Sequence, residues 1–145
     1  MDFTLTEEQK QILALIKQFG QKEFQTKQFT DLVQAVTSAN SIAEVRSYKP
    51  QVHALLDKLH DVGLRQIGVP TEYGGGGADI VTQMLVSEAF GYWGGRPIII
   101  ALWLSGAGGG KQKGLTVSKK QEWIFEQFMS NHHMLLGPAA YDDLT

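Results

Sequence analysis

One segment of the chain carries metal-binding side chains at helical spacing. His53, Asp57 and His60 stand at positions i, i+4 and i+7, which share one face of an α-helix. Imidazole and carboxylate groups together bind divalent transition metals. On a 3.6-residue wheel this face lies roughly 100° from the apolar stripe of the same helix. We therefore expect a solvated face that binds no metal.

A second group of possible ligands lies near the end of the chain. His132 and His133 are adjacent, and Asp142 and Asp143 follow them. Chain ends are usually the least firmly held part of a domain. A loose tail is therefore the expected setting for these residues, rather than a metal site.

Clusters of glycine suggest a phosphate-binding loop, but their spacing does not fit one. Gly110-Lys111 matches the end of a P-loop, whereas Ser105 occupies the place of its first glycine and Gln112 that of its Ser or Thr. Residues 106–111 also miss the dinucleotide motif G-x-G-x-x-G, because Lys111 replaces the last glycine. The sequence predicts flexible or closely packed backbone here.

One acidic residue falls on an apolar helix face. Glu88 shares this face with Val81, Met84 and Leu85. A buried carboxylate must be paired or neutral. Arg65 and Arg96 are the candidate partners, and a structural ion pair is expected rather than a catalytic acid.

Composition and charge exclude several classes of functional site. The 145 residues include no cysteine, so disulfides, thiolate metal sites and a thiol nucleophile are excluded. A formal net charge of −2 gives no electrostatic footprint for nucleic acid. The apolar run Pro97–Leu104 is too short for a membrane span, which needs about 20 residues, and residues 1–15 do not resemble a signal peptide. We expect a soluble, cytoplasmic protein.

Periodicity predicts helices throughout and few strands, so the fold class is all-α. Thr6 and Gln9 form a potential capping box, and Gly20 frays or kinks the first helix, with Phe24 continuing its face. Later helices begin at Pro50, which suits a first helical position, and after Asp79 and Ser118, which are N-cap residues. The inward side chains of the helix after Asp79 are expected to be Ile80, Val81, Met84, Leu85 and Ala89. The expected helices span residues 6–25, 50–62, 80–91, 97–104 and 119–129. Residues 26–49 are less decided: Phe29, Leu32, Val33 and Val36 have helical spacing, and residues 42–48 would add one or two turns.

The segments between these helices are expected to be irregular. Gly63 is a plausible C-cap, and the loop through Gly74–Gly77 follows it. Gly94-Gly95 should break the chain before the helix at Pro97. Residues 105–114 remain open between helix and loop, and the tail from His132 is extended or irregular. The result is an orthogonal or up-down bundle of five to six helices.

Several segments in order resemble the acyl-CoA dehydrogenase family. They are residues 1–13 (MDFTLTEEQKQIL), residues 55–91, which contain Val69-Pro70, Glu72-Tyr73-Gly74-Gly75 and Glu88-Ala89-Phe90-Gly91, and residues 118–132 (SKKQEWIFEQFMSNH). The resemblance covers residues 1–20 and 50–133. It implies that residues 1–133 form the family's N-terminal helical domain. Residues 134–145 then lie where the middle β domain of the family begins.

The tail departs from the common pattern of the family. Where most members carry T-E-P in a loop that contacts the flavin, residues 139–143 read AAYDD. This is similar to the divergent small-subunit branch, whose members pair with a large dehydrogenase subunit. The resemblance therefore implies a homo-oligomer or a heteromer with such a subunit.

The family reaction is α,β-dehydrogenation of an acyl-CoA thioester, with a glutamate base and FAD as hydride acceptor. The resemblance places the base and the flavin in domains outside this chain, so no catalytic residue is assigned and the chain alone is expected to bind no FAD. It implies that the helical domain contributes to the acyl-chain pocket, through Ala101, Leu102 and Ser105. One alternative is a helical interaction module without enzymatic activity, and another is a nucleotide or metal binder.

Overall fold

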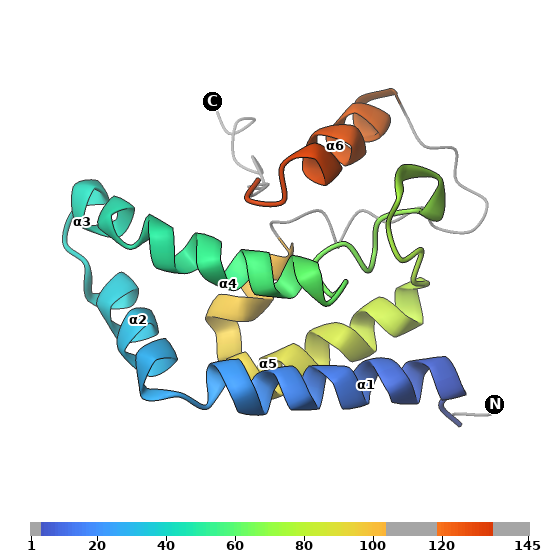
Figure 1. The fold of residues 1–145 in the computed structure, drawn as a ribbon, viewed down its shortest axis with the longest axis horizontal. Coiled ribbons are helices and arrows are strands. Elements are labelled where there is room, and N and C mark those ends of the chain that lie inside the picture. The colour runs from blue at the N-terminus through green and yellow to red at the C-terminus, as the bar shows by residue number, and fades with distance from the viewer. Residues whose placement is uncertain (1–3, 104–118, 135–145) are drawn as a thin grey trace, which may run out of the picture.

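The computed structural model describes residues 4–103 and 119–134, and it is helical with no strand in these ranges (Figure 1). The elements are α1 (Glu7–Phe19), the π-helical turn η1 (Gly20–Phe24), α2 (Lys27–Ser38), α3 (Ile42–Ser47), α4 (Lys49–Asp61), the 3-10 turn η2 (Thr71–Tyr73), α5 (Ile80–Trp103) and α6 (Lys119–Ser130). The prediction of an all-α fold is confirmed. Within the described ranges, no helix combines the length and the apolar character needed to cross a lipid bilayer.

The first helix begins as its sequence predicts. Thr6 Oγ1 accepts from the Gln9 backbone N–H at 3.1 Å, and Gln9 Oε1 accepts from the Thr6 backbone N–H at 3.0 Å. This capping box satisfies two donors that the helix leaves free. At Gly20 the helix does not end but widens into η1, and Phe24 continues the buried face at 4% exposure.

The next helices also follow their sequence signals. Thr26 and Ser41 cap α2 and α3 through their hydroxyl oxygens, and α4 carries Pro50 in its first turn. The end of α4 is a Schellman motif, in which the Gly63 N–H donates to the His60 carbonyl and the Leu64 N–H to the Leu59 carbonyl. Gly63 adopts φ +77°, which favours glycine over residues with a Cβ.

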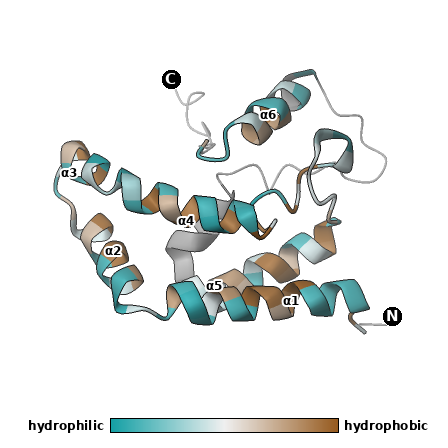
Figure 2. Ribbon diagram, in the orientation of Figure 1, coloured by the Kyte–Doolittle hydropathy of each residue, from teal (hydrophilic) through white to brown (hydrophobic). Residues whose placement is uncertain are grey.

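The main core lies where α1 and η1 pack against α5 and α4. Figure 2 shows hydrophobic residues concentrated where α1 and α5 run together. Gly20 permits this close approach, because a Cβ there would lie 2.5 Å from Cβ and Cγ of Trp93. The buried cluster comprises Ile16, Phe19, Phe24, Leu56, Leu59, Leu64, Ile67, Val86 and Phe90. Val62, which directly follows α4, is not part of this cluster, and its side chain is 38% exposed.

Helix α5 corrects two predictions. It continues through Gly94-Gly95 and Pro97 without the predicted break, and it bends in its C-terminal part (Figure 1). Proline and glycine inside a helix are common causes of such a bend. The break was expected from local propensity, which tertiary context routinely overrides.

The buried face of α5 is also offset from the predicted one. Val86 and Phe90 are buried at 4% and 0% exposure, whereas Met84 is 67% exposed. Ile80 and Val81 also face outward, and Leu85 and Ala89 are half-buried. Asp79 caps this helix as predicted, with its Oδ1 accepting from the Thr82 N–H at 2.8 Å. The helix has apolar residues on both sides, so periodicity alone could not select the inner one.

A smaller core joins α6 to the loop before η2. Val69, Phe125 and Phe128 are buried together, with Tyr73, Met129 and Met134 packed around them. The predicted helix over residues 119–129 is confirmed, and within it Trp123 is 57% exposed. The predicted cap Ser118 and residues 105–114 lie outside the described residues.

Candidate functional site

A buried arginine joins the end of α4 to the turn after α6. Arg65 follows the C-cap of α4 and its side chain is 0% exposed. Its Nε donates to the His132 carbonyl, its Nη2 donates to the Met134 carbonyl at 2.6 Å, and its guanidinium lies 4.8 Å from the centre of the Phe128 ring. Burial lowers the pKa of Arg65 to about 10, so the group remains charged at neutral pH. The backbone of residues 132–134 is thereby fixed.

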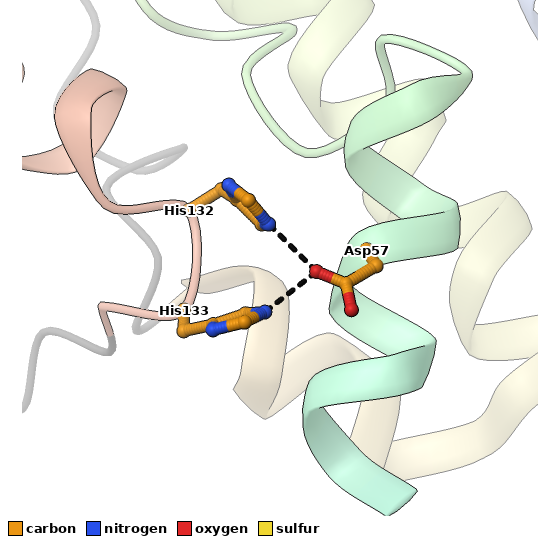
Figure 3. A group of neighbouring side chains, drawn as sticks. All are labelled: Asp57, His132 and His133. Atoms are coloured by element: carbon orange, nitrogen blue, oxygen red, sulfur yellow. Dashed lines mark hydrogen bonds and ion pairs between the residues drawn. The ribbon is translucent and has the colours of Figure 1, made fainter. Parts of the chain in front are cut away.

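The fixed turn brings all four histidines of the chain to one face of α4. Nε2 of His132 and Nε2 of His133 each lie 2.6 Å from the same oxygen, Oδ1 of Asp57 (Figure 3). Asp57 comes from α4, and the two imidazoles reach it from the turn that follows α6. We call Asp57, His132 and His133 the histidine–aspartate triad.

The remaining histidines of α4 support the triad from the side. His53 stacks on His133 with ring centres 3.9 Å apart, and His60 stacks on His132 with centres 4.4 Å apart. The interplanar angles are 23° and 15°, so each pair is close to parallel. The stacks restrict how far the two triad rings can tilt.

Electrostatics keep the carboxylate of the triad ionised. Hydrogen bonds from His132 and His133 lower the pKa of Asp57 below its usual range. Desolvation, followed by the nearby charge of His133, lowers the pKa of His53 and favours its neutral form. The side chains of Asp57, His132 and His133 are 48%, 34% and 30% exposed, so the triad remains open to solvent.

The sequence separated what the structure brings together. His53, Asp57 and His60 do share one face of α4, but this face is covered in part by His132 and His133. The expectation of a loose tail is wrong for residues 132–134, because Arg65 holds their carbonyls. No local signal could find this contact, since 75 residues separate Asp57 from His132. Asp142 and Asp143 lie outside the described residues.

The predicted burial of Glu88 is wrong. Glu88 lies on the same face as Met84, as the spacing indicates, but this face is exposed to solvent. Arg65, one candidate partner, is engaged with the carbonyls of His132 and Met134. The other, Arg96, lies in a part of α5 whose side chains are not described. The prediction failed because it assigned the wrong side of α5 to the core.

The loop of four glycines does not fit a phosphate group. The N–H groups of Gly75, Gly76 and Gly77 donate to the carbonyls of Pro70, Gln66 and Val69 at 3.2, 3.0 and 2.8 Å. A Cβ at Gly75 would lie 2.2 Å from the Val69 carbonyl oxygen. The glycines therefore allow close backbone packing, and their donors are not free to hold the pyrophosphate of a nucleotide or of FAD.

The predicted pocket residues occupy the far end of α5. Ala101 and Leu102 lie within this helix, which ends at Trp103, and Ser105 lies outside the described residues. Their role in binding an acyl chain stays a prediction.

Comparisons with known proteins identify the family of this chain. The model of the acyl-CoA dehydrogenase N-terminal domain matches residues 6–124. A protein of Escherichia coli K12, named probable acyl-CoA dehydrogenase YdiO, is 36% identical over 85 residues, as are its namesakes in E. coli O6:H1 and O157:H7. The aligned part covers 59% of this chain and 19% of each relative. No solved structure matches the chain significantly. Because the family model spans most of its length, the chain belongs to the acyl-CoA dehydrogenase N-terminal domain family.

Proposed function

We propose that the chain acts as the N-terminal helical domain of an FAD-dependent acyl-CoA dehydrogenase, either as part of a longer protein or as a small subunit. In this role it helps to enclose the acyl chain of an acyl-CoA thioester during α,β-dehydrogenation. FAD supplies hydride acceptance when it is bound. The glycine loop of this chain does not fit that cofactor, so the flavin and the glutamate base would come from other domains or a partner subunit.

The observation that carries the proposal is an uncovered apolar face on α5. This outer face of α5 comprises Ile80, Val81, Met84 and Tyr92, with exposed fractions of 52%, 56%, 67% and 79%, and Glu88 is the acidic residue among them. Extended apolar patches are unusual on the surface of a monomer and commonly mark an interaction site. The bare face therefore supports a domain that packs against further parts of a larger enzyme.

Introducing a negative charge on the outer face of α5 tests this role. The chain is co-expressed with the flavin-bearing part of its enzyme, and both co-purification and dye-linked acyl-CoA oxidation are measured. Met84→Glu should reduce both by at least about tenfold, because a buried unpaired carboxylate opposes docking. Ile42→Glu on α3 is the matched control, since Ile42 is 72% exposed and distant in sequence from this face.

Three outcomes would contradict the proposal. Met84→Glu could leave association unchanged, or Ile42→Glu could weaken it equally. Association without a flavin spectrum or acyl-CoA oxidation would favour the non-enzymatic interaction module instead.

The proposed acyl pocket has a separate test in the same assembled enzyme. Ala101→Phe should fill the pocket and raise KM for long acyl-CoA thioesters about tenfold more than for short ones, because each methylene in an apolar pocket contributes about 1–3 kcal/mol. Leu102→Ala and Ser105→Phe provide the companion measurements. An equal change for all chain lengths would place these residues outside the pocket.

A further inference from the structure

We propose that Asp57, His132 and His133 form a binding site for a divalent transition-metal ion of the zinc class. This inference is independent of the acyl-CoA dehydrogenase role. It rests on the convergence of three potential ligand atoms from two distant parts of the chain, Oδ1 of Asp57 and Nε2 of each histidine, which all lie within 4.8 Å of one another.

The geometry is close to that of a metal site. Zinc lies about 2.0–2.2 Å from nitrogen and carboxylate oxygen ligands, so tetrahedral ligand atoms are about 3.3 Å apart. In the triad, Oδ1 of Asp57 lies 2.6 Å from each imidazole Nε2 (Figure 3). A movement of about 0.7 Å, within the reach of side-chain rotation, would therefore admit the ion.

The backbone that presents the two imidazoles is organised before any ion binds. Arg65 holds the carbonyls of His132 and Met134, and the His133 N–H donates to Oδ1 of Asn131 at 3.1 Å. Ion binding would therefore order little additional chain, which favours affinity.

The rings are also held in orientation. His53 backs His133, and His60 backs His132, through near-parallel stacks. These two histidines are positioning residues in the proposal, whereas the triad supplies the ligands. Supporting residues around a metal commonly tune affinity without contacting the ion.

The donor types select the class of ion. Two imidazoles and one carboxylate suit zinc, nickel, cobalt or copper, whereas magnesium and calcium prefer sites made of oxygen. Three protein ligands leave a tetrahedral ion with one open position. The 30–48% exposure of the triad side chains would allow water or a ligand from another molecule to occupy it.

Calorimetry on the whole chain, prepared without a polyhistidine tag, tests the site. Titration with zinc chloride should give binding of one ion per chain, and magnesium chloride should give none. Asp57→Asn, His132→Gln and His133→Gln should each weaken zinc binding by about 100-fold or more, since loss of outer supporting groups alone weakens metal sites about 10- to 100-fold.

The matched controls are His53→Phe and His60→Phe, which keep an aromatic ring for stacking but remove the imidazole nitrogens. Because each variant keeps the stacked ring and all three ligands, zinc binding should weaken by less than the about 10- to 100-fold expected when a supporting group is lost altogether. Cobalt bound to the wild-type chain should show visible ligand-field bands of a tetrahedral site, and this readout does not require any variant to fold.

The proposal is overturned by an absence of zinc binding to the wild-type chain, by equal binding of magnesium, or by an octahedral cobalt spectrum. It is also overturned if His53→Phe or His60→Phe abolishes binding as fully as the triad variants, because the ligand set would then be different.

Discussion

Helix α4 has two faces that are held by different kinds of interaction. One face inserts Leu56 and Leu59, 2% and 0% exposed, into the aromatic core formed with α1, η1 and α5. The other face presents Asp57 to His132 and His133 in the turn after α6. In Figure 1 the helix accordingly lies between α1 and α6.

The contrast teaches where stability and chemistry reside in this domain. The apolar face gains its free energy from non-directional burial, which tolerates small shifts. The polar face depends on a few directional contacts organised by Arg65, so a single substitution can release it. We expect changes on the apolar side to lower global stability and changes on the polar side to act locally.

The largest effect is expected in the aromatic core. Phe90→Ala should lower the free energy of unfolding by about 3–5 kcal/mol, because a fully buried ring is replaced by a cavity. Urea denaturation followed by circular dichroism measures the change. Tyr92→Ala, two residues along α5 and 79% exposed, is the control and should stay within about 0.5 kcal/mol. Similar losses for both variants would show that α5 is not packed as described.

Removing the buried arginine should affect the polar face of α4 and leave its apolar face intact. Arg65→Met takes the donors away from the carbonyls of His132 and Met134, and we expect a loss of about 2–4 kcal/mol, since each buried unpaired group costs about 1–3 kcal/mol. Hydrogen exchange should show lost protection in residues 119–134 while α1 keeps its own. The exposed Arg46→Met provides the control. Uniform loss of protection would mean that the two faces unfold together.

A smaller effect is expected where two helices approach most closely. Gly20→Ala places a Cβ 2.5 Å from Cβ and Cγ of Trp93, atoms near the backbone that cannot simply rotate away. We expect a loss of about 1–3 kcal/mol from overpacking, measured by thermal unfolding. Lys17→Ala at an exposed position of α1 should change little. An unchanged stability of Gly20→Ala would indicate that α5 can shift along α1.

The smallest effect concerns one directional contact away from both faces. Hydrogen bonds from Thr82 lower the pKa of Asp79, the N-cap of α5. Because the folded pKa is lowered, this contribution is complete above the unfolded value of about 3.9 and is lost as the pH falls through the folded value. Asp79→Ala should cost about 1 kcal/mol at neutral pH and much less in acid.

Asp79→Asn is the control for that titration. It retains a capping oxygen that does not titrate, so its stability relative to Asp79→Ala should not vary between neutral and acidic pH. A pH dependence in the asparagine variant would assign the effect to another group.

The apolar side of this contrast was largely predictable from the sequence, and the polar side was not. Capping residues such as Thr6 and Asp79 act locally, so sequence identifies them directly. Leu56 and Leu59 follow the helical period of the core. The side of α5 that faces inward could not be read, because apolar residues such as Met84 also occupy its outer side.

The candidate metal site shows the same limit of prediction from the sequence. The spacing of His53, Asp57 and His60 correctly places them on one helix face, but whether His132 and His133 reach that face depends on long-range packing. Arg65 holds these histidines near α4 through its hydrogen bonds to the backbone, and nothing in its immediate neighbours in sequence indicates that it is buried.

The π-helical turn η1 makes chain length a constraint in its own right. The rings of Phe19 and Phe24 meet edge to face with centres 5.3 Å apart, although five positions along a regular α-helix would point them in different directions. Regular α-helical winding brings two side chains to one face after four positions, not five, so η1 takes up one extra residue. Deleting that residue would leave a regular helix with Phe24 still on the buried face, whereas inserting a second one would turn Phe24 roughly 100° away from the core.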